Sequence, residues 1–142
     1  MAAKSHYFEG KLLEHMFKGV ALPDYSDTHD TYLALFTDLP SGDTPPSTEV
    51  TTSGSAYARQ ALKAKFASSS VANQSSGAQI STSAEIAFSV ATSNWGNIQS
   101  MCVMDAATGG NVLYYATFTQ AKQIYTGDQL KIASGSLTIL ED

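Results

Sequence analysis

The chain is poor in cysteine, and this excludes a disulfide framework. Among its 142 residues there is a single cysteine, Cys102. A chain of this length fits one domain and buries a sufficient core without disulfides or a structural metal. Cys102 lies in an apolar run and has no basic neighbour in the sequence. We therefore expect a buried packing residue rather than a nucleophile.

Charge is also scarce, with 15% charged residues and a formal net charge of -5. Nucleic-acid binding requires clustered Lys and Arg, and the only basic group is Lys63 and Lys65 with Arg59 nearby. The remaining polarity comes from Ser, Thr, Asn and Gln, a composition common in β-rich extracellular and virion proteins. The sequence predicts no nucleic-acid partner.

Long apolar runs are missing. No segment approaches the roughly 20 apolar residues that cross a bilayer, and Lys4 is not followed by the apolar region of a signal peptide. We expect no membrane partner, and synthesis and folding in a cytoplasm.

Motifs of catalysis and metal binding are missing as well. The sequence contains no G-x-S-x-G, H-E-x-x-H or phosphate-binding loop. The densest group of potential metal ligands is Asp24, Asp27, His29 and Asp30. It lacks the alternating acids and the glycine of a calcium loop, so we interpret it as a solvated acidic loop. The sequence predicts no catalytic residue, no metal site and no cofactor.

The clearest positive signal is a β-hairpin over residues 98–118, in which two apolar, β-prone runs flank a turn from Asp105 to Asn111. Short runs of the same kind follow and precede it, with alternation over 85–90 and a turn at Gly127-Asp128 before a last strand at 137–140. This spacing predicts a mainly β fold and a single domain over 1–142, as an antiparallel β-sandwich or a jelly-roll-like barrel.

The N-terminal part predicts one amphipathic helix over 5–19, with Ser5 as N-cap and Gly19 after the last turn. Its apolar stripe either binds a partner or covers one face of the sheet, and ordinary amphipathic behaviour favours the second. The stripe consists of Phe8, Leu12, Leu13, Met16 and Phe17.

Three further segments complete the organisation. Residues 31–37 form a nearly continuous apolar run, predicted as a central strand with one face against the helix. Residues 38–56 are a long loop rich in Pro, Gly, Ser and Thr, expected at an exposed edge where it could reach a neighbouring subunit. Residues 57–142 are the β-rich body, beginning with an alternating strand over 57–67.

Three aromatic residues are the best candidates for binding. Tyr114 and Tyr115 point to opposite faces of a strand, so one is expected in the core and the other exposed. Trp95 lies in a turn and either closes one end of the core or, with an exposed Tyr, stacks on a sugar ring or in a subunit interface. Together with Phe8 and Leu12, these residues are the candidate interface or glycan contacts.

Four segments occur in a characteristic order. They are residues 7–19, residues 31–37, Glu49-Val50 with Ala56-Tyr-Ala-Arg-Gln60, and Trp95-Gly96 with residues 104–115. This set resembles a family of small tailed-bacteriophage structural proteins of the tail-fibre-like or minor virion protein type. The resemblance implies a non-enzymatic virion component that assembles with itself, for instance as a cyclic trimer, and with other virion proteins.

The chain is shorter than a host-reading fibre and lacks long shaft repeats. We therefore expect an accessory role, as a tail-fibre-like, collar or capsid decoration (cement) protein. The alternative is a host-glycan-binding module of the tail adsorption apparatus.

Overall fold

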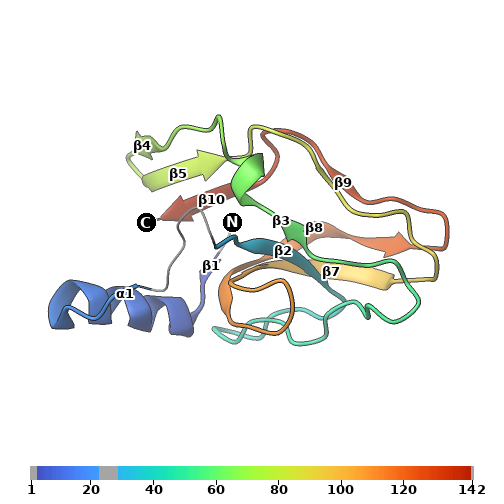
Figure 1. The fold of residues 1–142 in the computed structure, drawn as a ribbon, viewed down its shortest axis with the longest axis horizontal. Coiled ribbons are helices and arrows are strands. Elements are labelled where there is room, and N and C mark those ends of the chain that lie inside the picture. Colours follow the sequence, from blue (N-terminus) through green and yellow to red (C-terminus); the bar gives the residue numbers. More distant parts are fainter. Residues whose placement is uncertain (1–2, 23–28, 142) are drawn as a thin grey trace.

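A computed structural model describes residues 3–22 and 29–141 and shows a mainly β protein with one α-helix in that part of the chain (Figure 1). The largest sheet is antiparallel, with strand order β1-β8-β7-β2-β3, and smaller sheets of order β10-β5-β4 and β6-β9 accompany it. The elements are β1 (Ala3–Lys4), α1 (His6–Lys18), β2 (Tyr32–Phe36), β3 (Gln60–Ala61), the 3₁₀ turn η1 (Lys63–Lys65), β4 (Ala72–Gln74), β5 (Gly77–Ser81), β6 (Ile86–Ala87), β7 (Gly96–Met104), β8 (Val112–Ile124), β9 (Lys131–Ile132) and β10 (Thr138–Glu141).

The sheets do not close on themselves, so the fold is a sandwich-like arrangement rather than a barrel. The predicted mainly β class, the antiparallel pairing and the single N-terminal helix are confirmed. No helix in the described part of the chain is long and apolar enough to span a membrane.

The predicted hairpin is the centre of the fold and extends further than expected, as β7 and β8. Cys102 pairs with Tyr115 and Val103 with Tyr114, so neighbouring side chains point to opposite faces of the sheet. We call the sheet β10-β5-β4, with the segment that leads into β10, the second layer. One face of the hairpin sheet, with Leu33 and Val103, belongs to the main core together with Leu137 of the second layer. The other face, with Cys102 and Tyr115, forms a smaller cluster of its own.

Burial on both faces explains the continuous apolar run of the central strand β2. Leu33 and Leu35 point into the main core, and Ala34 and Phe36 into the smaller cluster. Cys102 is fully buried there, and burial raises the pKa of its thiol to about 12. The prediction of an inert packing cysteine is confirmed.

The long loop over 38–56 is anchored at several points. The Asp38 carboxylate accepts hydrogen bonds from the backbone N–H groups of Ser47 (2.8 Å) and Thr48 (2.9 Å). Val50 and Ser55 are buried in the body of the protein. The longest exposed runs are the two tips at 41–44 and 51–54. The loop is therefore part of the packed structure between two exposed tips.

The predicted strand over 57–67 is wrong for most of its length. Only β3 pairs with β2, and the chain then turns into η1. The turn forms because the Asp30 carboxylate accepts from the backbone N–H groups of Leu62 (3.2 Å) and Lys63 (2.9 Å). A long-range contact of this kind has no signal in local alternation.

The structure departs from the local sequence pattern in two further places. The polar segment 68–77 contains β4 and the first residue of β5. Val90 is exposed, whereas Ile86 and Phe88 are in the core, because regular pairing in β6 ends at Ala87.

Helix α1 has the predicted caps but does not lie across the face of the sheet as predicted. The Ser5 hydroxyl accepts from the Phe8 backbone N–H (3.2 Å), and Gly19 ends the helix with φ 69°. None of its residues is buried. It contacts β8, and its Tyr7 and Phe8 pack against the main core, with the Phe8 and Tyr114 rings 5.4 Å apart; the helix then runs away from the body (Figure 1).

The expectation that α1 covers the sheet and meets the strand at 31–37 is therefore wrong. The core face that it would have covered is occupied by residues of the second layer, such as Leu137 and Ile139.

Candidate functional site

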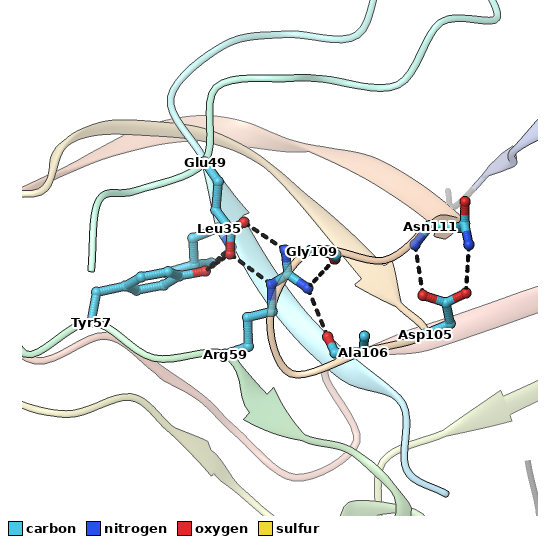
Figure 2. A network of polar contacts seen from close by, with 8 residues as sticks. All are labelled: Leu35, Glu49, Tyr57, Arg59, Asp105, Ala106, Gly109 and Asn111. Atoms are coloured by element: carbon cyan, nitrogen blue, oxygen red, sulfur yellow. Dashed lines mark hydrogen bonds and ion pairs between the residues drawn. The ribbon is translucent and has the colours of Figure 1, made fainter. Parts of the chain in front are cut away.

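Arg59 holds together two segments that are distant in the sequence (Figure 2). Its Nε and Nη2 donate to the two carboxylate oxygens of Glu49 at 2.8 and 2.7 Å. Its Nη1 donates to the backbone carbonyls of Ala106 and Gly109, both at 2.7 Å. The Arg59 side chain is only 7% exposed. The planar guanidinium suits this arrangement because its N–H groups form a fixed fork.

Tyr57 extends the contact into the core. Its hydroxyl donates to Glu49 Oε1 and accepts from the Leu35 backbone N–H, each at 2.9 Å. Burial raises the pKa of this phenol, and the hydrogen bonds that Arg59 donates to Glu49 raise the pKa of the Arg59 guanidinium. We call Glu49, Tyr57, Arg59 and the two carbonyls the Arg59 clamp.

The hairpin loop that Arg59 grips is fixed a second time from within. The Asp105 carboxylate accepts from the Asn111 backbone N–H (2.6 Å) and from its side-chain amide (2.9 Å). Gly110 adopts φ +75°, and a Cβ there would lie 2.3 Å from Asp105 Oδ1. Glycine is required at this point by both conformation and space.

The clamp ties the hairpin loop to the segment that carries Glu49 and Tyr57. The Glu49 carboxylate accepts from Tyr57 and Arg59, and the guanidinium donates to Glu49 and to two loop carbonyls. An open hollow of about 340 Å³ lies beside it, bordered by Thr51, Thr52 and the loop residue Thr108. The arrangement presents a rigid, uncharged loop tip at 106–110.

A second feature is the apolar surface of α1. Leu13, Met16 and Phe17 are exposed to 58%, 70% and 76%, and Val20, just beyond the helix, to 43%. We call these four residues the α1 stripe. Leu13, Met16 and Phe17 are adjacent on one helical face, and a contiguous apolar patch of this kind marks an interaction site.

The predicted contact residues lie in different places. Trp95 is 4% exposed and donates its ring N–H to the Ser55 carbonyl (2.8 Å), which agrees with the core alternative and leaves no ring face open to a sugar in the isolated chain. Tyr115 is buried, and Tyr114 is half-buried with its hydroxyl donating to Glu141. Phe8 and Leu12 are half-buried on α1.

The structure thus brings Phe8 and Tyr114 together and separates them from Trp95. Tyr114 and Tyr115 point to opposite faces, as predicted, but the expectation that one of them is exposed is wrong, because Tyr115 is buried and Tyr114 is half-buried against the main core.

The acidic cluster lies partly outside the described residues, because Asp24 and Asp27 fall in 23–28. His29 contacts the Asp105 carbonyl through Nε2 at 2.7 Å, and Asp30 caps η1. Within 3–22 and 29–141, no three His, Cys, Asp or Glu side chains are grouped as metal ligands.

Sequence reasoning missed the role of Glu49 and Arg59. Both lie in segments that carried the resemblance to phage proteins, yet ten residues separate them and the Gly109 carbonyl is fifty residues from Arg59. The one available signal was an isolated Arg beside a Tyr at the start of an otherwise charge-poor body.

Fold and site together define a β-rich structural protein, in which the strongest polar contacts fix loops and the accessible apolar surface is a helix. No curated protein matches the chain. The chain belongs to the family described as Podophage GP4 fiber I protein gp80, whose model matches residues 3–140. It is therefore a structural protein of the phage fibre type and a component of the virion, which confirms the resemblance.

Proposed function

We propose that the chain is an accessory fibre-type component that works by contact, assembling with copies of itself and with neighbouring virion proteins through helix α1. The observation that carries this proposal is the α1 stripe. An isolated soluble domain has no reason to present adjacent Leu, Met and Phe side chains to water, because exposing each one costs free energy that burial in an interface would recover.

The polar chemistry supports a role without catalysis. Glu49 and Arg59 neutralise each other, and the buried Cys102 thiol has a raised pKa that keeps it protonated at neutral pH. Neither this ion pair nor this thiol is poised for proton transfer.

The test is the association state of the full chain, measured by sedimentation velocity over a wide concentration range. Wild type is expected to form a discrete oligomer, and Phe17→Ser is expected to shift it towards monomer. Val90→Ser is the matched control, because Val90 is also an exposed apolar residue, 48% accessible, but lies outside the helix.

Particle incorporation provides the second measurement. Virions assembled with Phe17→Ser are expected to carry fewer copies of the chain than virions with Val90→Ser. A wild-type chain that stays monomeric at all concentrations, with Phe17→Ser incorporated normally, would contradict the proposal.

A further inference from the structure

A small polar hollow lies beside the Arg59 clamp. Its volume is about 340 Å³, at the lower end of the range for small-molecule sites. One wall consists of residues 49–52, and the other consists of residues 107–109 of the hairpin loop. Thr52 and Thr108 are exposed residues of these two walls. The walls therefore carry hydroxyl groups, which both donate and accept hydrogen bonds.

The clamp holds the two walls of the hollow together. Arg59 binds the Glu49 carboxylate of the first wall and the Gly109 carbonyl of the second. The second wall is fixed again by the hydrogen bonds between Asp105 and Asn111. A site whose walls are already in place loses little free energy to ordering when a ligand binds. The hollow is therefore pre-formed.

Glu49 and Arg59 each keep one hydrogen-bonding position beyond those that the clamp uses (Figure 2). A guanidinium carries one N–H group on Nε and two on each Nη atom. In Arg59, the second N–H of Nη2 has no acceptor among the described residues, although the side chain is only 7% exposed. Glu49 Oε2 accepts a single hydrogen bond in the same part of the chain, and this side chain is 25% exposed.

The two positions form an adjacent donor and acceptor, because Arg59 Nη2 and Glu49 Oε2 are 2.7 Å apart. Both residues line the hollow. A largely buried donor without an acceptor costs free energy, which a ligand oxygen placed there would recover.

The charge and spacing of this pair indicate the class of ligand. Glu49 and Arg59 neutralise each other and are the only charged residues among those that line the hollow, so an anion finds no unpaired cation there. A ligand that meets both positions must accept at Nη2 and donate at Oε2. A trans peptide group cannot do this from one side, because its N–H and C=O point in opposite directions.

Two hydroxyl groups on adjacent carbons of a sugar ring meet both requirements. Each hydroxyl can donate or accept, and the two oxygens of such a pair are separated by about the distance between Nη2 and Oε2. None of the described residues that line the hollow is aromatic, so a sugar here is held by polar contacts at its edge rather than by stacking.

We propose that the hollow binds one sugar unit through two neighbouring hydroxyl groups. One hydroxyl oxygen accepts from Arg59 Nη2, and the other hydroxyl donates to Glu49 Oε2. Thr52 and Thr108 contact the remaining hydroxyl groups from the two walls. Without stacking the site is weak, with a dissociation constant of about 1 mM or above. This inference goes beyond the proposed function and does not depend on self-assembly.

The test is an NMR titration of the isotopically labelled full chain with the methyl glycosides of glucose, galactose, mannose and rhamnose. These probes present neighbouring hydroxyl groups in different orientations. For at least one of them, we expect saturable shifts at the amides of Thr52, Thr108 and Gly109 and at the Nε–H of Arg59. The matched control ligand is methyl glucoside with every hydroxyl methylated, which keeps the ring but cannot donate to Glu49, and it is expected to cause no saturable shift.

One substitution in the wall tests the location of the site. Thr108→Leu narrows the hollow and removes a hydroxyl, so it is expected to weaken binding of the responding glycoside at least about fivefold. The clamp contacts of this loop are made by backbone carbonyls, which the substitution retains. Thr119→Leu is the matched control, the same change at an exposed position of β8 outside the hollow, and should bind as wild type does. Thr52→Leu repeats the test on the other wall.

Three results would overturn the inference. The first is the absence of saturable shifts with all of the glycosides. The second is a set of shifts confined to the walls while the Arg59 Nε–H does not move, because the adjacent donor and acceptor would then not be used. The third is saturation by phosphate or acetamide but by no glycoside, which would assign the hollow to an anion or an amide. None of these results bears on association through helix α1.

Discussion

The Arg59 clamp and helix α1 differ in the kind of side chain that they bury and the kind that they expose. In the clamp, polar groups are drawn inward and each finds a partner, with Arg59 held by Glu49 and two loop carbonyls. In α1, apolar groups are turned outward, and Phe17 is 76% exposed. The fold therefore uses a largely buried ion pair to hold a loop, whereas helix α1 leaves apolar side chains in water.

The contrast separates what the chain needs to fold from what it presents. Residues of the clamp and core should determine the stability of the monomer, whereas residues of the α1 stripe should have little influence on it. Four comparisons of variants, from the largest expected loss of stability to the smallest, test this division.

The largest expected difference in the free energy of unfolding is between alanine variants of Phe88 and Phe17. Phe88 is fully buried beside Tyr57 and Trp95. Phe88→Ala is expected to lower the free energy of unfolding by about 3–5 kcal/mol because it leaves a cavity. Phe17→Ala should change the stability of the monomer by less than about 0.5 kcal/mol. Urea unfolding at a concentration where the chain is monomeric measures both, and equal losses would abolish the distinction between core and stripe.

Arg59→Ala is expected to cost about 3 kcal/mol, because it leaves the Glu49 carboxylate without its buried partner. Arg59→Lys should cost less but remain destabilising, since a single ammonium cannot span Glu49 and two carbonyls. The exposed pair Lys11 and Glu14, 3.1 Å apart, provides the control, and Lys11→Ala should cost about 0.5 kcal/mol or less. Chemical denaturation measures all three, and an Arg59→Ala protein as stable as Lys11→Ala would mean that the clamp contributes nothing.

Gly110 and Gly109 test the rigidity of the loop. Both have positive φ, but only at Gly110 would a Cβ collide with Asp105 and Ala106. Gly110→Ala is expected to lower stability by about 2–3 kcal/mol, and Gly109→Ala by about 1 kcal/mol, from conformation alone. Thermal unfolding of the pair gives the comparison. A Gly109→Ala effect equal to or larger than that of Gly110→Ala would show that the Asp105 contact does not constrain the loop.

Substitution of Asp38 is expected to cause the smallest loss of stability, and this loss should depend on pH. Burial raises the pKa of its carboxyl, but the hydrogen bonds from Ser47 and Thr48 outweigh burial and hold the pKa below its ordinary value. The stability that this carboxylate contributes is therefore present above its unfolded pKa of about 3.9 and lost as pH falls through the lower folded value.

Asp38→Asn should accordingly be less stable than wild type at pH 7. The difference should shrink steadily once the pH falls below about 4. Urea unfolding of both proteins across this range measures it. A difference that does not change with pH would show that the ionised carboxylate does not anchor the loop.

Local patterns predicted a large part of this fold. The hairpin followed from apolar runs around Gly109-Gly110, and the helix from Ser5, Gly19 and the spacing of its apolar residues. These elements depend on contacts close in sequence, or on periodicity that either element shows by itself. The strand at 57–67 failed because Asp30 and Tyr57 impose long-range hydrogen bonds that override weak alternation.

The functional features show the same division between what local pattern predicts and what long-range contacts determine. The apolar stripe of α1 was visible in the sequence, but its destination was not, since periodicity shows that a face is apolar and not what covers it. The sequence did not distinguish between a core and a surface position for Trp95. The structure has it in the core, where its ring packs against Tyr57 and Phe88.

Local sequence pattern was enough to predict a β-rich fold with an N-terminal amphipathic helix, a buried cysteine and the resemblance to a phage virion family. Long-range contacts bring Arg59 to Glu49 and to the 105–111 loop, and they leave the far end of α1 exposed. Local elements could be predicted because amphipathicity and turn conformation depend on a few neighbouring residues. Which apolar surfaces are satisfied depends on how the whole chain fills its own core.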